Sequence, residues 1–88
     1  MVEMYPEQLF LESIIKTLAT KPDQVRIARK TDEMGILYTV SVSEDDVAKI
    51  IGKEGATAKA IRCLLKIVAH DNNVRAAMKI DAPTIVKN

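Results

Sequence analysis

Aromatic side chains are scarce in this chain, which has no tryptophan and only Tyr5, Phe10 and Tyr38 among its 88 residues. RRM domains and OB folds hold the bases of single-stranded nucleic acids by stacking them on exposed aromatic rings. Three aromatic residues are too few for such a platform. Any recognition of nucleic acid by this chain must therefore depend on backbone charge and aliphatic contacts.

Cysteine and histidine occur once each, as Cys63 and His70. A single cysteine excludes an internal disulfide and a zinc site of several cysteines, and it suits a reducing compartment such as the cytoplasm. We interpret Cys63 as a buried or half-buried apolar residue, and His70 as an exposed residue near a helix C-terminus rather than a metal ligand. The sequence contains neither a nucleophile beside a base nor a P-loop, so it predicts a binding module rather than an enzyme, with no catalytic residue, cofactor or metal ion.

Long apolar runs are absent too, since none approaches the ~20 residues needed to cross a bilayer. The N-terminus carries Glu3 and Glu7 and lacks a basic head before an apolar stretch, so it is unlike a secretion signal. A chain of 88 residues with 48% hydrophobic content is long enough for one small domain and too short for two. We therefore expect one cytoplasmic domain over residues 1–81 and a loose tail over 82–88.

Glycine occurs only three times, and two of the three lie in the segment Gly52-Lys53-Glu54-Gly55. Because glycine has no side chain and adopts backbone angles that other residues avoid, a Gly-x-x-Gly turn between two helices lets a phosphate backbone approach closely. The helix that follows adds free N–H groups and the positive end of its dipole. Such a turn can also serve only to reverse the chain, so the spacing alone leaves both interpretations open.

Basic residues gather around this turn, although the formal net charge of the whole chain is only +1. Residues 49–66 hold five of them against the single acid Glu54, a local balance of +4 that leaves −3 for the rest of the chain. The five are Lys49, Lys53, Lys59, Arg62 and Lys66. The last three share one helix face, because they are spaced three and four residues apart. This basic stripe of Lys59, Arg62 and Lys66 is either an ordinary solvated face or the track of a bound polyanion.

The spacing of apolar residues predicts six elements. They are a helix from Pro6 that stops within residues 20–23, strands at 25–30 and 36–42 joined by a turn at 31–35, helices at 43–52 and 57–70, and a strand at 75–80. Ser43 and the acids at 44–46 are explained as the cap and first turn of a helix, although the acids could also be imagined as a metal cluster. The order predicts an α+β fold, with three helices covering one face of a three-stranded sheet.

The segment from Ile50 to Ile61 resembles the signature of KH domains, in which an isoleucine–glycine pair precedes the Gly-x-x-Gly loop and aliphatic residues follow it. The element order α-β-β-α-α-β is similar to the bacterial type II KH fold. Over residues 7–81 the chain most resembles the small single-domain RNA-binding proteins of the bacterial KhpA family. The typical run of that family, Ile-Gly-Lys-x-Gly-x-x-Ala-Lys-Ala-Ile/Leu-Arg, stands here as Ile51 to Arg62.

The resemblance implies a function and a set of site residues. It implies an RNA-binding protein that holds about four nucleotides of single-stranded RNA across the loop and an adjoining groove, and we expect it to act as a post-transcriptional regulator or RNA chaperone. By position, the backbone of Gly52 and Gly55 approaches a phosphate, while Ile51 and Ala58 line the groove. The RNA-binding set that the resemblance and the basic residues predict is Lys49, Ile51, Gly52, Lys53, Glu54, Gly55, Ala56, Thr57, Ala58, Lys59 and Arg62.

Two positions depart from the general KH pattern. Ala58 is smaller than the aliphatic residue common there, which implies a shallower base contact, although alanine is normal in the KhpA group. Ala56 stands where similar proteins often carry a basic residue, which implies one phosphate contact fewer and a weaker affinity.

The resemblance also implies protein partners, because KhpA-like proteins pair with larger KH proteins of the KhpB or Jag type, which are linked to cell division, cell shape and cell-wall synthesis. In the helix at 57–70, apolar positions sweep roughly 240°, far more than one core-facing stripe needs. We therefore expect a homodimer, or a heterodimer with such a partner, and assign the interface to Ile61, Leu65 and Val68. The alternative to RNA binding is a protein-interaction subunit that uses the KH fold mainly as this dimer surface.

Overall fold

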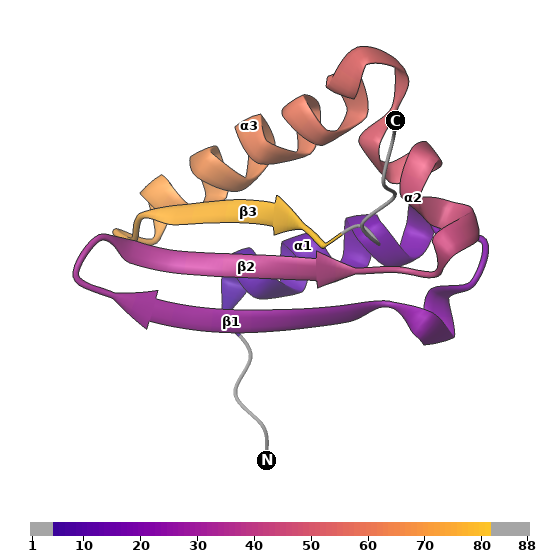
Figure 1. Ribbon diagram of the computed structural model, residues 1–88. Coiled ribbons are helices and arrows are strands. Elements are labelled where there is room, and N and C mark those ends of the chain that lie inside the picture. Colours follow the sequence, from indigo (N-terminus) through magenta and orange to yellow (C-terminus); the bar gives the residue numbers. More distant parts are fainter. Residues whose placement is uncertain (1–4, 82–88) are drawn as a thin grey trace, which may run out of the picture.

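A three-stranded sheet carries three helices on one of its faces (Figure 1). The computed structural model describes residues 5–81, so the predicted tail at 82–88 lies outside the described residues and the boundary at 81 stays a prediction. The elements are α1 (Pro6–Leu18), β1 (Arg26–Asp32), β2 (Gly35–Ser41), α2 (Glu44–Ile51), α3 (Ala56–Asp71) and β3 (Ala76–Ile80), with 3₁₀ turns at Pro22–Gln24 and Lys53–Gly55. The predicted α+β class and the α-β-β-α-α-β order of a type II KH fold are confirmed.

The hairpin of β1 and β2 is antiparallel, as predicted, but its turn is shorter than the sequence predicts. Asp32 pairs with Gly35, so only Glu33 and Met34 connect the two strands. The Asp32 carboxylate accepts a hydrogen bond of 2.8 Å from the N–H of Met34, the side-chain-to-backbone bond that aspartate favours in turns. The predicted turn over residues 31–35 is therefore wrong at both ends.

β3 lies parallel to β2 and forms one edge of the sheet, whose order is β1-β2-β3. The N–H of Ile36 donates a hydrogen bond of 2.8 Å to the carbonyl of Arg75, at the start of the ladder. Alternate residues of a strand direct their backbone groups to the same side, so every second residue from Arg75 onward faces β2. The residues whose N–H and C=O groups point to the free edge are Ala76, Met78 and Ile80.

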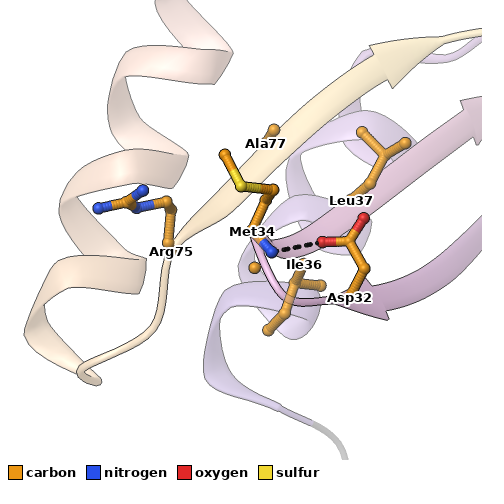
Figure 2. Close-up of a pocket in the computed structure, with 7 residues that line it drawn as sticks. Asp32, Met34, Ile36, Leu37, Arg75 and Ala77 are labelled. Carbon is orange, nitrogen blue, oxygen red and sulfur yellow. Dashed lines mark hydrogen bonds between the residues drawn. The ribbon is translucent and has the colours of Figure 1, made fainter.

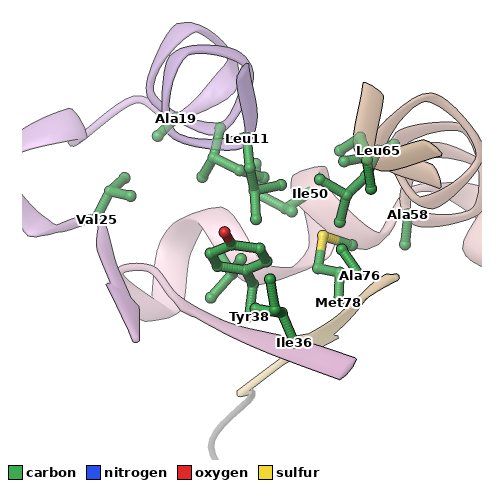
Figure 3. Packing of buried hydrophobic residues seen from close by; sticks show 14 residues of the cluster. Leu11, Ala19, Val25, Ile36, Tyr38, Ile50, Ala58, Leu65, Ala76 and Met78 are labelled. Atoms are coloured by element: carbon green, nitrogen blue, oxygen red, sulfur yellow. The ribbon is translucent and has the colours of Figure 1, made fainter. Parts of the chain in front are cut away.

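The core fills the space between the sheet and the helices (Figure 3). Successive side chains of a strand point to opposite faces, and in β2 the buried ones are Ile36, Tyr38 and Val40. Leu11 and Ile15 come from α1 and are completely buried, which confirms the predicted apolar face of this helix. The arc of α3 that faces the core consists of Ala58, Ile61, Leu65 and Ala69.

One polar cluster lies within this core and ties α1 to the hairpin. The Tyr38 hydroxyl donates a hydrogen bond of 2.9 Å to the buried Glu7 carboxylate, and Nε of Arg29 donates one of 3.2 Å to the Tyr38 oxygen. The Arg29 guanidinium also lies 3.7 Å from the centroid of the Tyr5 ring, a cation–π contact. Burial raises the pKa of Tyr38 to about 12, so its hydroxyl remains a donor to Glu7 at neutral pH.

A second buried polar group, Asp46, anchors α2 to the segment that follows α1. Its carboxylate accepts hydrogen bonds from the N–H and hydroxyl of Thr20 (2.9 and 2.7 Å), the N–H of Lys21 (3.1 Å) and the hydroxyl of Ser43 (3.1 Å). Lys21 also forms a 2.7 Å salt bridge with Asp45. The predicted capping role of the acids is therefore incomplete, and across residues 5–81 no group of side chains is arranged to hold a metal ion.

This anchor makes the stability of the fold depend on pH. Hydrogen bonds from Thr20 lower the pKa of Asp46 from 3.8 to about 2. Between those values the unfolded chain binds the proton more readily, so the stabilisation from the carboxylate is complete above about pH 4 and is lost as pH falls through about 2. We expect the free energy of unfolding in urea to fall from pH 5 to pH 2, and to fall less steeply in Asp46→Asn.

The neighbouring variant Asp45→Asn is the matched control, because it removes an exposed carboxylate of the same helix turn and should keep the steeper fall. The same pH dependence in wild type and Asp46→Asn would show that this carboxylate does not have the lowered pKa.

Candidate nucleic-acid interface

The turn at residues 52–55 connects α2 to α3 through left-handed backbone. At Gly52, where φ is 79°, a Cβ atom would lie 2.7 Å from Cβ of Thr57 and 2.8 Å from its nitrogen. Gly55 has φ of 76° and open space around it, so its backbone angles alone call for glycine. Gly52 is needed for a further reason, because the turn folds closely onto the first turn of α3.

Lys53 and Glu54 are exposed at the tip of this turn. Glu54 has φ of 55°, a left-handed conformation that residues with side chains adopt infrequently. The tip thus presents one positive and one negative side chain. A net attraction for an anion must come from the groups behind the tip.

Those groups are backbone N–H groups in the first turn of α3, of which the N–H of Ala56 already donates a hydrogen bond to the carbonyl of Lys53. The N-cap residue is Gly55, no side chain caps the helix, and its first turn contains no acid. The first N–H groups of a helix have no partner within it, and the helix dipole favours negative charge beside them. The start of α3 is therefore suited to a phosphate.

The basic stripe lies on the flank of α3 that faces the free edge of β3. Lys59 and Lys66 are exposed, whereas Arg62 is half-buried because its Nε donates a hydrogen bond of 3.2 Å to the carbonyl of Met78. A hollow of about 410 Å³ on this flank is lined by Lys59, Arg62, Cys63, Lys66 and Ile67. The sequence predicts Arg62 as a phosphate ligand but does not reveal that it also ties α3 to β3.

The other predicted contacts differ in exposure. Lys49 is exposed on the last turn of α2, Ala56 is exposed at the start of α3, and Ile51 and Thr57 are half-buried. Ala58 is only 3% exposed, so its methyl group belongs to the core and offers almost no surface to a base. Of the predicted pair of groove residues, only Ile51 has surface left for a ligand.

The predicted dimer interface needs a correction. Ile61 and Leu65 are 2% and 0% exposed, because both point from α3 into the core of their own chain. Neither can be presented to a second copy, and Val68 is half-buried. The outer apolar face of α3 consists instead of Ala60, Cys63, Leu64 and Ile67. One part of the long apolar sweep serves the core and the other part is exposed.

The single cysteine and histidine both lie on the surface of α3. His70 is exposed in the last turn, as the sequence predicts, but Cys63 is exposed as well, so the prediction that it is buried or half-buried is wrong. Cys63 is exposed because it lies on the side of α3 that faces away from the core. Of the helices in the described part of the chain, none combines the length and the apolar character needed to cross a membrane.

Comparisons with known proteins agree with this geometry. The family model described as "KhpA/KhpB, KH domain" matches residues 8–80. The RNA-binding protein KhpA of Chlamydia pneumoniae is 51% identical over 71 residues, which cover 81% of this chain and 91% of that protein. Proteins of the same name from Clostridium acetobutylicum and Listeria monocytogenes are 40% and 38% identical, over 80% and 84% of this chain and 93% and 96% of their own lengths. No solved structure gives a significant match. The chain therefore belongs to the KhpA/KhpB family of KH domains.

Proposed function

We propose that this chain binds single-stranded RNA with the turn at residues 52–55 and the flank of α3 that faces the free edge of β3. The observation that carries the proposal is the start of α3, which has no acid and no side-chain cap and lies behind a turn whose shape requires Gly52. The relatives in three bacteria are named RNA-binding proteins. KH domains in general clamp about four nucleotides at such a loop.

The proposal assigns the RNA backbone and the bases to different surfaces. One phosphate lies at the N–H groups that follow Ala56 in the first turn of α3, and its neighbours pair with Lys53, Lys59 and the remaining N–H groups of Arg62. The bases turn toward Ile51 and the outward backbone groups of β3. Because contacts to the RNA backbone dominate, we expect weak preference for base sequence.

The chain acts in this proposal as a binding module in the cytoplasm, with no catalytic residue, cofactor or metal ion. Its role is that of a post-transcriptional regulator or RNA chaperone. A connection with cell shape and cell-wall organisation follows from the family resemblance.

The dependence of binding on salt tests the proposal. Three or four phosphate contacts from Lys49, Lys53, Lys59 and Arg62, at a slope of about 0.7 per contact for a single strand, should weaken binding roughly twenty- to fifty-fold between 50 and 200 mM salt. Filter binding with single-stranded RNA measures this slope, and a duplex of the same sequence is the control, which should bind more weakly. An affinity that does not change with salt would remove the basic residues from the mechanism.

A second candidate function rests on the outer apolar face of α3. Leu64 and Ile67 are 44% and 54% exposed, beside the exposed Ala60 and Cys63. A homodimer through this face, or a heterodimer with a larger KH protein of the KhpB or Jag type, would remove these side chains from water. Cys63 and Ile67 also line the hollow beside the basic stripe, so such a dimer would cover part of the proposed RNA path. It is the main function only if RNA affinity is absent.

A further inference from the structure

Two more hollows lie next to the one beside the basic stripe, and each shares a lining residue with its neighbour. The first, of about 360 Å³, lies between the end of α3 and the start of β3, and its lining includes Lys66, His70 and Arg75. The second, of about 160 Å³, lies between the β1–β2 turn and β3, and Arg75 lines it as well (Figure 2). Lys66 and Arg75 thus link three hollows in a row, from the middle of α3 to the hairpin turn.

Positive charge predominates along this row. The hollow beside the basic stripe and the one at the end of α3 are lined by no acidic residue. Their basic lining residues are Lys59, Arg62, Lys66, His70 and Arg75. The hollow beside the β1–β2 turn is lined by one acid, Asp32, together with Arg75. Neither of the two salt bridges found within residues 5–81 involves Lys59, Arg62, Lys66 or Arg75. The row therefore presents positive charge that acids of the described chain do not pair with.

The spacing of these basic side chains suits a strand of repeating negative charge. From Lys59 to His70 the basic residues recur every three or four positions, which is about 4.5–6 Å of helix rise at each step and about 16 Å in total. That step is comparable with the distance between phosphates in an extended single strand. At the far end, Met34 is 73% exposed and lies with Leu37 and Ala77 around the last hollow, so apolar surface is present there for a base (Figure 2).

We propose that the RNA strand held at residues 52–55 continues along α3 to Lys66, His70 and Arg75, so that the bound segment is longer than the four nucleotides of a KH groove. The inference rests on the proposed function and names a second part of the same site. A continuous strand is favoured over a separate ligand because the hollows share Lys66 and Arg75 and begin beside the proposed phosphate contacts. The extension adds about three nucleotides, for a total of roughly seven.

The test compares two RNA lengths in two charge-matched variants. Lys66→Gln with Arg75→Gln removes two charges from the far part of the row, and Lys16→Gln with Lys30→Gln removes two from exposed positions on α1 and β1. Chemical-shift titrations at low salt measure binding of oligouridylates of five and twelve nucleotides. We expect the first variant to bind the longer RNA roughly tenfold more weakly than wild type and the shorter RNA about equally. The control variant should change neither affinity by more than about twofold.

A longer RNA can bind a four-nucleotide site in more registers, which raises its apparent affinity for wild type and for both variants alike. Only an extended site makes the variant at Lys66 and Arg75 lose affinity for the longer RNA alone. An equal loss for both lengths, or no loss for either, would overturn the extension while leaving binding at the turn intact. Failure of wild type to bind even the five-nucleotide RNA would instead refute the proposed function, and the extension with it.

Discussion

Replacing Lys53 and Glu54 together with aspartate should weaken binding of single-stranded RNA roughly a hundredfold or more. The double change removes a cation and places two carboxylates at the tip of the turn, beside the proposed phosphate. The fold should survive, because both side chains are exposed and aspartate tolerates the left-handed backbone at position 54, where φ is 55°. The free energy of unfolding should change by less than ~0.5 kcal/mol.

Fluorescence anisotropy gives the affinity, and circular dichroism during urea unfolding reports the fold. Lys16→Asp is the matched control, since it makes the same change of charge at an exposed position of α1 and should weaken binding less than about threefold. If the double variant binds RNA as tightly as wild type, the RNA site lies elsewhere. If it unfolds, the side chains of the turn are structural.

Leu65→Asp should unfold the chain, whereas Leu64→Asp, one residue earlier, should leave it folded. Leu65 is 0% exposed and Leu64 is 44% exposed. A carboxylate without a partner in the core, together with the lost leucine packing, costs more than ~4 kcal/mol, which is close to the whole stability of ~5 kcal/mol expected of a small domain. At Leu64 the carboxylate remains in water and lies on the outer apolar face of α3.

Circular dichroism and light scattering together separate the possible results. If the outer apolar face joins two copies, wild type should have twice the 9.7 kDa of one chain and Leu64→Asp should have the mass of one. A folded Leu65→Asp protein would contradict the assignment of Leu65 to the core. A wild-type mass of one chain would exclude the homodimer and leave the heterodimer with a larger KH protein.

The turn and its flanking helices could be predicted because their signals are local. Gly52 and Gly55 stand where the helical periodicity stops and restarts, and only glycine suits the backbone there. The apolar spacing of Leu11 and Ile15 likewise gives the inner face of α1 without knowledge of its neighbours. Such signals require only residues within a few positions of one another.

Polar contacts between distant segments could not be predicted in this way. Asp46 accepts hydrogen bonds from Thr20, 26 residues earlier, and Tyr38 donates one to Glu7, 31 residues earlier. An acid in the first turn of a helix has the same local pattern whether it only favours the helix dipole or binds a remote backbone. The sequence therefore explains Asp46 as a residue of the first helical turn, although it is also the anchor of α2.

The inner face of α3 was ambiguous for a different reason. Its apolar residues sweep roughly 240°, and a core-facing arc of little over 100° fits at several angles within that sweep. Only the positions of α1 and the sheet select the arc that contains Ile61 and Leu65. Their assignment to a dimer interface is wrong because the periodicity gives the width of the apolar surface and not its orientation.

The hydrogen bond from Arg62 to Met78 also bears on aggregation. An edge strand with unpaired N–H and C=O groups is a template on which a strand of another molecule can add, and natural proteins shield such edges. β3 is only five residues long, and the Arg62 guanidinium occupies the outward carbonyl at its centre. A strand approaching from a second molecule therefore meets a bulky charged group midway along the row it would have to pair with. The side chain that neutralises a phosphate in our proposal thus also hinders the growth of one sheet across two molecules.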